Sequence, residues 1–259
     1  MTWRSHYRKP ALLALAALAA AATGLAGWWW RPGVDLQRWQ VGPPPAPWAA
    51  MRRQQAKWQD EGSRRLVEHE FVPLEEIALD LQLALLVNED IDFLGHGAID
   101  LAAVREAVQE WLAGRRLRGA STLSQQLAKS LFLSQERSLA RKLTETKLAW
   151  WLERKLGKRR ILELYLNVVE FGPGLFGAEA AAHHYFGVSA VQLDAAQAAS
   201  LAAGVPSPGR DNPATDSARW AARRAVILRR MIGATWLRER LVALAGSRQS
   251  TVDSPRPPP

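Results

Sequence analysis

Apolar residues recur through most of the chain at the three- and four-residue spacing of helices, and alternating strand patterns are nearly absent. One such stripe predicts a helix over 99–112. Its members are Leu101, Val104, Val108 and Trp111. A second helix is predicted to begin at Ser121 or Thr122, because either side chain can cap a first turn. The core face of this second helix consists of Leu123, Leu127 and Leu131.

The remaining chain continues this helical pattern with clear interruptions. Further helices are predicted over 138–156, 159–169, 176–186, 191–204 and 214–231. Gly172-Pro173-Gly174 and Pro206-Ser207-Pro208 break the pattern, as expected of turns. The sequence therefore predicts a mainly α-helical fold with a single domain.

The N-terminus has the pattern of a membrane segment. Basic residues in 1–9 precede 21 uncharged residues from Pro10 to Trp30, and roughly 20 apolar residues span the hydrocarbon core of a bilayer. Three consecutive tryptophans at 28–30 suit the far interface. We expect a transmembrane anchor over 10–30 with a cytoplasmic segment 1–9. A cleavable signal peptide is the alternative, since Ala19 to Ala22 offer small residues for cleavage. Both interpretations export the domain.

Proline content sets the other expected boundaries. Residues 31–48 are Pro-rich and predict an extended linker. The folded domain is expected over 49–235, followed at 236–259 by a helix remnant and a disordered Pro-rich tail.

Charge and composition narrow the classes of partner. The chain has 34 basic and 25 acidic residues, a formal charge of +9, which suggests nucleic acid, anionic lipid or a phosphorylated substrate. Export makes nucleic acid an unsuitable partner. The chain has no cysteine, which excludes disulfides, thiolate nucleophiles and cysteine-ligated zinc.

Three segments carry candidate chemistry. The segment Asn88 to Asp100 places Glu89 directly after an apolar run, and a carboxylate in such surroundings suits general acid or base catalysis. Solvated charges at a helix end are the alternative interpretation. In the segment Arg118 to Lys129, Gln125 and Lys129 share a helix face, and the helix start at Ser121 offers an anion site. An ordinary capped amphipathic helix would look the same.

The third segment runs from Arg137 to Glu145. Its Arg141 and Glu145 lie one helical turn apart, which is equally compatible with a surface ion pair. The pairs Arg223-Arg224 and Arg229-Arg230 are interpreted as a solvated basic face.

In this order and spacing, the segments resemble the family 51 glycosyltransferases, the peptidoglycan polymerases. The matching positions are Glu89-Asp90 with Phe93 and His96-Gly97, Gly119 to Lys129, Arg141-Lys142 with Glu145, Arg160 to Asn167, and Arg224 to Leu228. No serine is followed three residues later by lysine, the signature of the transpeptidase domain that many members also carry. The chain is thus most similar to the monofunctional biosynthetic peptidoglycan transglycosylases.

The resemblance implies a lysozyme-like helical domain with two lobes around a cleft, and lipid II as substrate. Glu89 would be the catalytic base, and Glu145 the second glutamate, which orients nearby cations or the donor phosphates. The implied substrate-binding residues are Arg118, Ser121, Thr122, Gln125, Gln126, Lys129, Arg137, Arg141 and Lys142. The resemblance leaves open whether a divalent cation, Mg²⁺ or Mn²⁺, takes part, and no residue is assigned as its ligand.

The implied partners are lipid II, the nascent glycan strand, the bacterial inner membrane and other proteins of cell-wall synthesis, with the catalytic domain in the periplasm. Two rival functions remain. A lytic enzyme of lysozyme-like fold would also use one glutamate in a helical cleft, but it needs no cluster of cations. A non-catalytic scaffold in cell-wall assembly would need neither glutamate.

Overall fold

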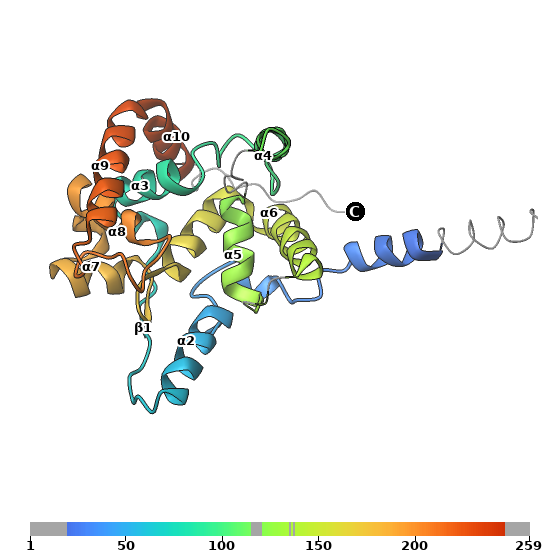
Figure 1. The fold of residues 1–259 in the computed structure, drawn as a ribbon, viewed down its shortest axis with the longest axis horizontal. Coiled ribbons are helices and arrows are strands. Elements are labelled where there is room, and N and C mark those ends of the chain that lie inside the picture. Colours follow the sequence, from blue (N-terminus) through green and yellow to red (C-terminus); the bar gives the residue numbers. More distant parts are fainter. Residues whose placement is uncertain (1–19, 115–120, 135, 137, 247–259) are drawn as a thin grey trace, which may run out of the picture. The chain divides into compact units, whose positions relative to one another are not determined.

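The computed structural model describes residues 20–114, 121–134, 136 and 138–246 (Figure 1). The chain divides into a short N-terminal unit, which ends at Leu36, and a main unit, which begins at Gln37. In the first unit, residues 20–29 are helical. No helix within the described ranges is long and apolar enough to span a bilayer. Much of the predicted anchor at 10–30 lies outside them.

The main unit is mainly helical, as predicted. Its described α-helices are α2 (Ala49–Asp60), α3 (Leu79–Glu89), α4 (Leu101–Leu112), α5 (Leu123–Phe132), α6 (Leu139–Val168), α7 (Ala178–Phe186), α8 (Ala195–Gly204), α9 (Ala218–Gly233) and α10 (Thr235–Gly246). Single-turn 3-10 helices occupy Gln37–Trp39, Leu74–Glu76 and Ala190–Gln192.

Helix α3 lies at the centre of one part of the core. Every residue from Leu81 to Val87 is buried, because α3 packs against α8, α9 and α10 (Figure 1). Removal of this much apolar surface from water strongly favours the packed helix. The last residue of α3 is Glu89, so the core fixes the position of the backbone that carries this carboxylate.

Helices α5 and α6 form the neighbouring part of the core and follow the predicted pattern. Thr122 caps α5 in a capping box with Gln125, and the predicted core face of α5 is buried. The two helices predicted over 138–156 and 159–169 form α6, which is interrupted at Gly157. Gly157 has φ of 73°, a left-handed conformation that favours glycine, so the chain changes direction there.

A small sheet joins segments that are distant in sequence. Its strands are β1 (Glu68–His69), β2 (Glu170–Gly172) and β3 (Leu175–Phe176), in the order β1-β3-β2. Strand β3 runs parallel to β1 and antiparallel to β2. Strands of two or three residues are too short to show an alternating pattern, which explains why the sequence gives no signal for them.

The expected boundaries differ from the observed packing at both ends of the domain. Residues 37–48 of the expected linker belong to the main unit. Trp39 and Trp48 are buried there, and Arg160 donates hydrogen bonds to the carbonyls of Trp39 and Gly42. At the other end, α10 packs against α3 through buried side chains, although the domain was expected to end at residue 235. These side chains are Leu237 and Leu241.

The apolar stripe predicted on 99–112 does not form a buried face where it is described. Leu101 is 74% exposed and Val104 is 38% exposed. The side chains of Val108 and Trp111 lie outside the described part of the structure.

Candidate active site

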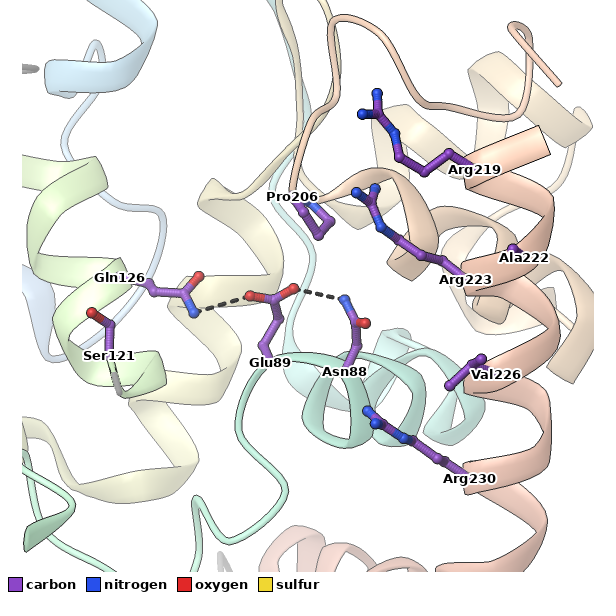
Figure 2. A pocket seen from close by; sticks show the side chains of 10 residues that line it. All are labelled: Asn88, Glu89, Ser121, Gln126, Pro206, Arg219, Ala222, Arg223, Val226 and Arg230. Carbon is purple, nitrogen blue, oxygen red and sulfur yellow. Dashed lines mark hydrogen bonds between the residues drawn. The ribbon is translucent and has the colours of Figure 1, made fainter. Parts of the chain in front are cut away.

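The carboxylate of Glu89 faces a cavity of about 600 Å³ between α3, α5 and α9 (Figure 2). The Gln126 amide nitrogen donates to Glu89 Oε2 at 3.0 Å, and the Asn88 amide nitrogen donates to Oε1 at 2.6 Å. Both carboxylate oxygens are therefore held by amide donors. The cavity is lined by Asn88, Glu89, Ser121, Gln126, Pro206, Arg219, Ala222, Arg223, Val226 and Arg230.

The surroundings of Glu89 make it a better proton acceptor near neutral pH. Burial raises the pKa of the Glu89 carboxyl above its ordinary value. The hydrogen bond from Gln126 and the charges of Lys129 and Arg223 oppose this shift, while Asp90 adds to it. A carboxylate of raised pKa that is open to a cavity can act as a general base.

Tyr165 on α6 orients Gln126. Its hydroxyl donates to Gln126 Oε1 at 3.1 Å, so the amide nitrogen of Gln126 must face Glu89. Burial, together with the charges of Glu89 and Asp90, raises the pKa of Tyr165 well above its ordinary value. Tyr165 therefore remains a protonated donor throughout the neutral range.

Asp90 connects the end of α3 to the loop that follows and to α5. Its Oδ1 lies 2.7 Å from His96 Nε2, and its Oδ2 accepts from the Leu123 amide at 2.7 Å. The other ring nitrogen of His96 lies 2.6 Å from the Gly97 carbonyl oxygen. Both ring partners are acceptors, which favours a doubly protonated imidazolium. Burial lowers the pKa of His96, but the bonds to Asp90 and Gly97 outweigh this effect and raise it.

A row of arginines on α9 lines the side of the cavity opposite Gln126 (Figure 2). Arg219, Arg223 and Arg230 are spaced at i, i+4 and i+11, which places them on one helix face. Arg223 donates to the Ala203 carbonyl at 3.3 Å and Arg230 to the Val87 carbonyl at 3.1 Å. The interpretation of Arg223-Arg224 and Arg229-Arg230 as a solvated basic face is therefore wrong for Arg223, which is half-buried, whereas Arg230 is exposed as expected. The sequence does carry a signal for this face, because Arg219, Arg223 and Arg230 lie with Val226 at helical spacing.

Glu145 belongs to a second network, between α5 and α6. Its buried carboxylate is 2.9 Å from Arg141 Nη1 and 2.5 Å from Lys142 Nζ. Lys142 also donates to Ser121 Oγ at 3.0 Å. Of the described residues in this network, Ser121 also lines the Glu89 cavity, so it connects the two groups.

The other predicted binding residues have different surroundings. Thr122 and Gln125 are buried and engaged in capping α5, and the Thr122 hydroxyl donates to the Ala98 carbonyl. Lys129 is exposed and acts on Glu89 through its charge. Arg118 and Arg137 lie outside the described residues.

A smaller, acidic cavity of about 160 Å³ adjoins Glu89 on another side. Its lining includes four carboxylates, those of Glu89, Asp90, Asp92 and Asp100. Within the described ranges, no three His, Asp or Glu side chains are arranged to hold a metal ion. The carboxylate of Glu145 is engaged by Arg141 and Lys142 instead. The described side chains around Glu89 and Glu145 therefore do not form a site that would hold a metal with protein ligands alone.

A carboxylate of raised pKa opposite a row of arginines has the arrangement that an enzyme needs in order to apply a general base to an anionic substrate. Sequence comparison specifies this class, because the model of the Transglycosylase family matches residues 57–232. The chain belongs to this transglycosylase family.

Curated relatives agree with this assignment. The biosynthetic peptidoglycan transglycosylase of Methylobacillus flagellatus is 44% identical over 171 residues, which cover 66% of this chain and 75% of the relative. The protein of the same description from Herminiimonas arsenicoxydans is 43% identical over 194 residues, covering 74% of this chain and 84% of the relative. That from Shewanella amazonensis is 50% identical over 151 residues, covering 58% and 62%.

Proposed function

We propose that this protein polymerises lipid II into β-1,4-linked peptidoglycan strands and releases undecaprenyl pyrophosphate, with Glu89 as the catalytic base. The observation that carries the proposal is the position of Glu89. Its carboxylate has a raised pKa, is held by two amide donors and opens onto a cavity lined by three arginines. The names of the relatives support the same activity.

In the proposed step, Glu89 accepts the proton of the 4-hydroxyl group of the acceptor sugar. The hydroxyl oxygen forms a bond to C1 of the donor sugar, and the bond between C1 and the pyrophosphate oxygen breaks. The pyrophosphate leaves with the electron pair, and the configuration at C1 is inverted. The hydrogen bonds from Gln126 and Asn88 fix the carboxylate in place for this transfer.

A pyrophosphate leaving group needs neutralisation of its charge more than it needs a proton. Arg219, Arg223 and Arg230 supply cationic donors in the cavity, and Lys129 lies near enough to affect Glu89. Guanidinium groups suit phosphate oxygens because they donate paired, charge-assisted hydrogen bonds. Arg118 and Arg137 remain proposed members of the same cation set.

The mainly helical fold and the central cavity support a lysozyme-like domain in which two lobes flank the site. A lytic enzyme would also use a glutamate, but hydrolysis of an uncharged glycan gives no role to a row of arginines. A non-catalytic scaffold gives no reason for a half-buried Glu89 carboxylate whose pKa is raised by desolvation, because such a charge is costly to keep in the folded state.

The test is to incubate the purified full-length protein with labelled lipid II in detergent and to separate the products by size. Polymer that lysozyme digests to disaccharide units supports the proposal. Conversion of pre-formed glycan to short fragments, without polymer from lipid II, would establish the lytic alternative. If folded protein carries out neither reaction, the result would favour the non-catalytic scaffold.

We also propose that residues 10–30 anchor the domain in the inner membrane with the catalytic site in the periplasm. The uncharged stretch and its basic flank support this placement. Deletion of residues 1–30 should preserve polymerisation in detergent and reduce it on lipid II in bilayers, because tethering raises the effective concentration. Equal loss in both media would show that the segment is part of the catalytic unit. Equal rates in both would favour a cleaved signal peptide, which N-terminal sequencing would identify.

A further inference from the structure

Asp211 lies in the loop between α8 and α9, and its backbone is closely held. Its amide donates to the Ser207 carbonyl at 2.8 Å. A Cβ at Gly204 would lie 2.9 Å from the Asp211 carbonyl oxygen, so the end of α8 packs directly against this loop. The Asp211 side chain is only 2% exposed. A buried carboxylate requires partners.

The partners of Asp211 are two of the cavity arginines and one serine. Its Oδ2 accepts from Arg219 Nε at 2.8 Å and lies 2.7 Å from Arg219 Nη2. The same oxygen is 3.3 Å from Arg223 Nη1. Its Oδ1 accepts from the Ser217 hydroxyl at 2.8 Å. Arg219, followed by Ser217 and Arg223, lowers the pKa of Asp211 despite burial, so the carboxylate is ionised at neutral pH.

The two arginines are long side chains that would otherwise sample many rotamers. The Arg219 side chain is 54% exposed, and Arg223 donates one further hydrogen bond, to the Ala203 carbonyl. Figure 2 shows both extending from α9 on the side of the cavity that also carries Pro206. Ordering such a side chain costs rotamer entropy if the ordering occurs only on binding. A contact that orders them beforehand improves binding of a ligand.

We propose that Asp211 is a positioning residue that holds Arg219 and Arg223 in the orientation in which they bind the anionic group of the substrate. This inference rests on the proposed function for the identity of that group, a pyrophosphate. Asp211 itself does not line the cavity, so it acts through the two arginines. The competing explanation is that Asp211 has a purely structural role. Its partner Ser217 caps α9 by accepting a hydrogen bond from the Trp220 amide, so Asp211 could simply hold this cap in place.

The experiment compares Asp211→Asn with Ser217→Ala in the full-length protein. The asparagine keeps the size of the side chain and removes its charge. The alanine removes the third partner of the same carboxylate together with the cap of α9, but it leaves both arginine pairs. Thermal unfolding, the KM and kcat for lipid II, and binding of inorganic pyrophosphate by calorimetry are measured for each variant.

We expect both variants to lower the melting temperature. Asp211→Asn should in addition raise the KM for lipid II and weaken pyrophosphate binding by roughly tenfold. The reason is that Arg219 and Arg223 lose the charge-assisted hydrogen bonds to Asp211 that hold them in the binding orientation. Ser217→Ala should leave both quantities within about twofold. Unchanged pyrophosphate binding in Asp211→Asn, or an equal loss in both variants, overturns the inference. If the wild type makes no polymer but binds pyrophosphate in an Asp211-dependent manner, positioning holds and the proposed function fails.

Discussion

The hydroxyl of Tyr165 donates to the side-chain carbonyl of Gln126, which in turn donates through its amide nitrogen to Glu89. These residues come from α6, α5 and α3, so the carboxylate is oriented by three helices that pack independently of the substrate. Without the tyrosine, rotation of the Gln126 amide could place its oxygen against the Glu89 carboxylate.

Removal of the Tyr165 hydroxyl tests this relay of hydrogen bonds from Tyr165 through Gln126 to Glu89. Tyr165→Phe should reduce kcat by about tenfold, since an incorrectly oriented Gln126 would no longer hold Glu89. The unpaired Gln126 oxygen should cost about 1 kcal/mol of stability. Tyr185→Phe is the matched control, because that hydroxyl donates to the Phe171 carbonyl and does not line the cavity. Equal loss of kcat in the two variants would contradict the relay.

Glu89→Gln should lower polymerisation by at least 10²-fold, the low end for loss of a general base. The folded state should be no less stable, because burial raises the pKa of Glu89 and thus disfavours its charged form. Initial rates and melting temperature are measured together. Glu239→Gln, an exposed position on α10, serves as control and should retain full activity. Retention of more than about a tenth of the rate by Glu89→Gln would exclude the proposed role.

The pH dependence of kcat/KM should reveal the titration of Glu89. A base must be ionised, so the rate should fall as the pH drops through its pKa, which lies above the ordinary 4.5. Lys129 lowers this pKa, and Lys129→Ala should therefore move the acidic limb to higher pH and reduce turnover. Lys57→Ala on α2, which is exposed, should do neither. An unmoved acidic limb in Lys129→Ala would show that this lysine does not act on the base.

The pair of His96 with Asp90 should contribute a pH-dependent part of the stability. The pKa of His96 in the folded protein is raised above 6.5. Its contribution is therefore complete below the unfolded-state pKa and is lost as the pH rises through the folded-state value. The difference in melting temperature between wild type and His96→Gln should be larger at pH 6 than at pH 9, both chosen to bracket a histidine of raised pKa. His183→Gln, which removes an exposed histidine from its pair with the buried Glu179, should change little at either pH.

Local features of the fold could be predicted from the sequence because their causes are local. The cap at Thr122, the buried leucines of α5 and the break at Gly157 each depend on residues within one or two helical turns. The burial of Trp39 and Trp48 was not predicted, because proline content gives no information on what an extended segment packs against.

The candidate site was predicted only in part for a similar reason. Apolar flanking residues made Glu89 a candidate, and the family resemblance favoured both Glu89 and Gln126, which the structure brings together at the cavity. The position of Arg219 and Arg223 opposite them depends on how α9 packs against α8 and against α3, which lies more than 120 residues earlier in the chain. Tyr165 lies in a predicted helix, but helical periodicity does not show that its hydroxyl meets the side chain of Gln126.

The two cavities that meet at Glu89 carry charges of opposite sign, arginines in the larger and carboxylates in the smaller. The site consequently has an electrostatic polarity that acts before any contact is made. An approaching ligand with one anionic and one neutral end is turned so that the anionic end leads into the arginine side. This steering operates over about 10 Å at 0.1 M ionic strength. Association should therefore slow as salt is added, and the ligand should lose its preferred direction of entry.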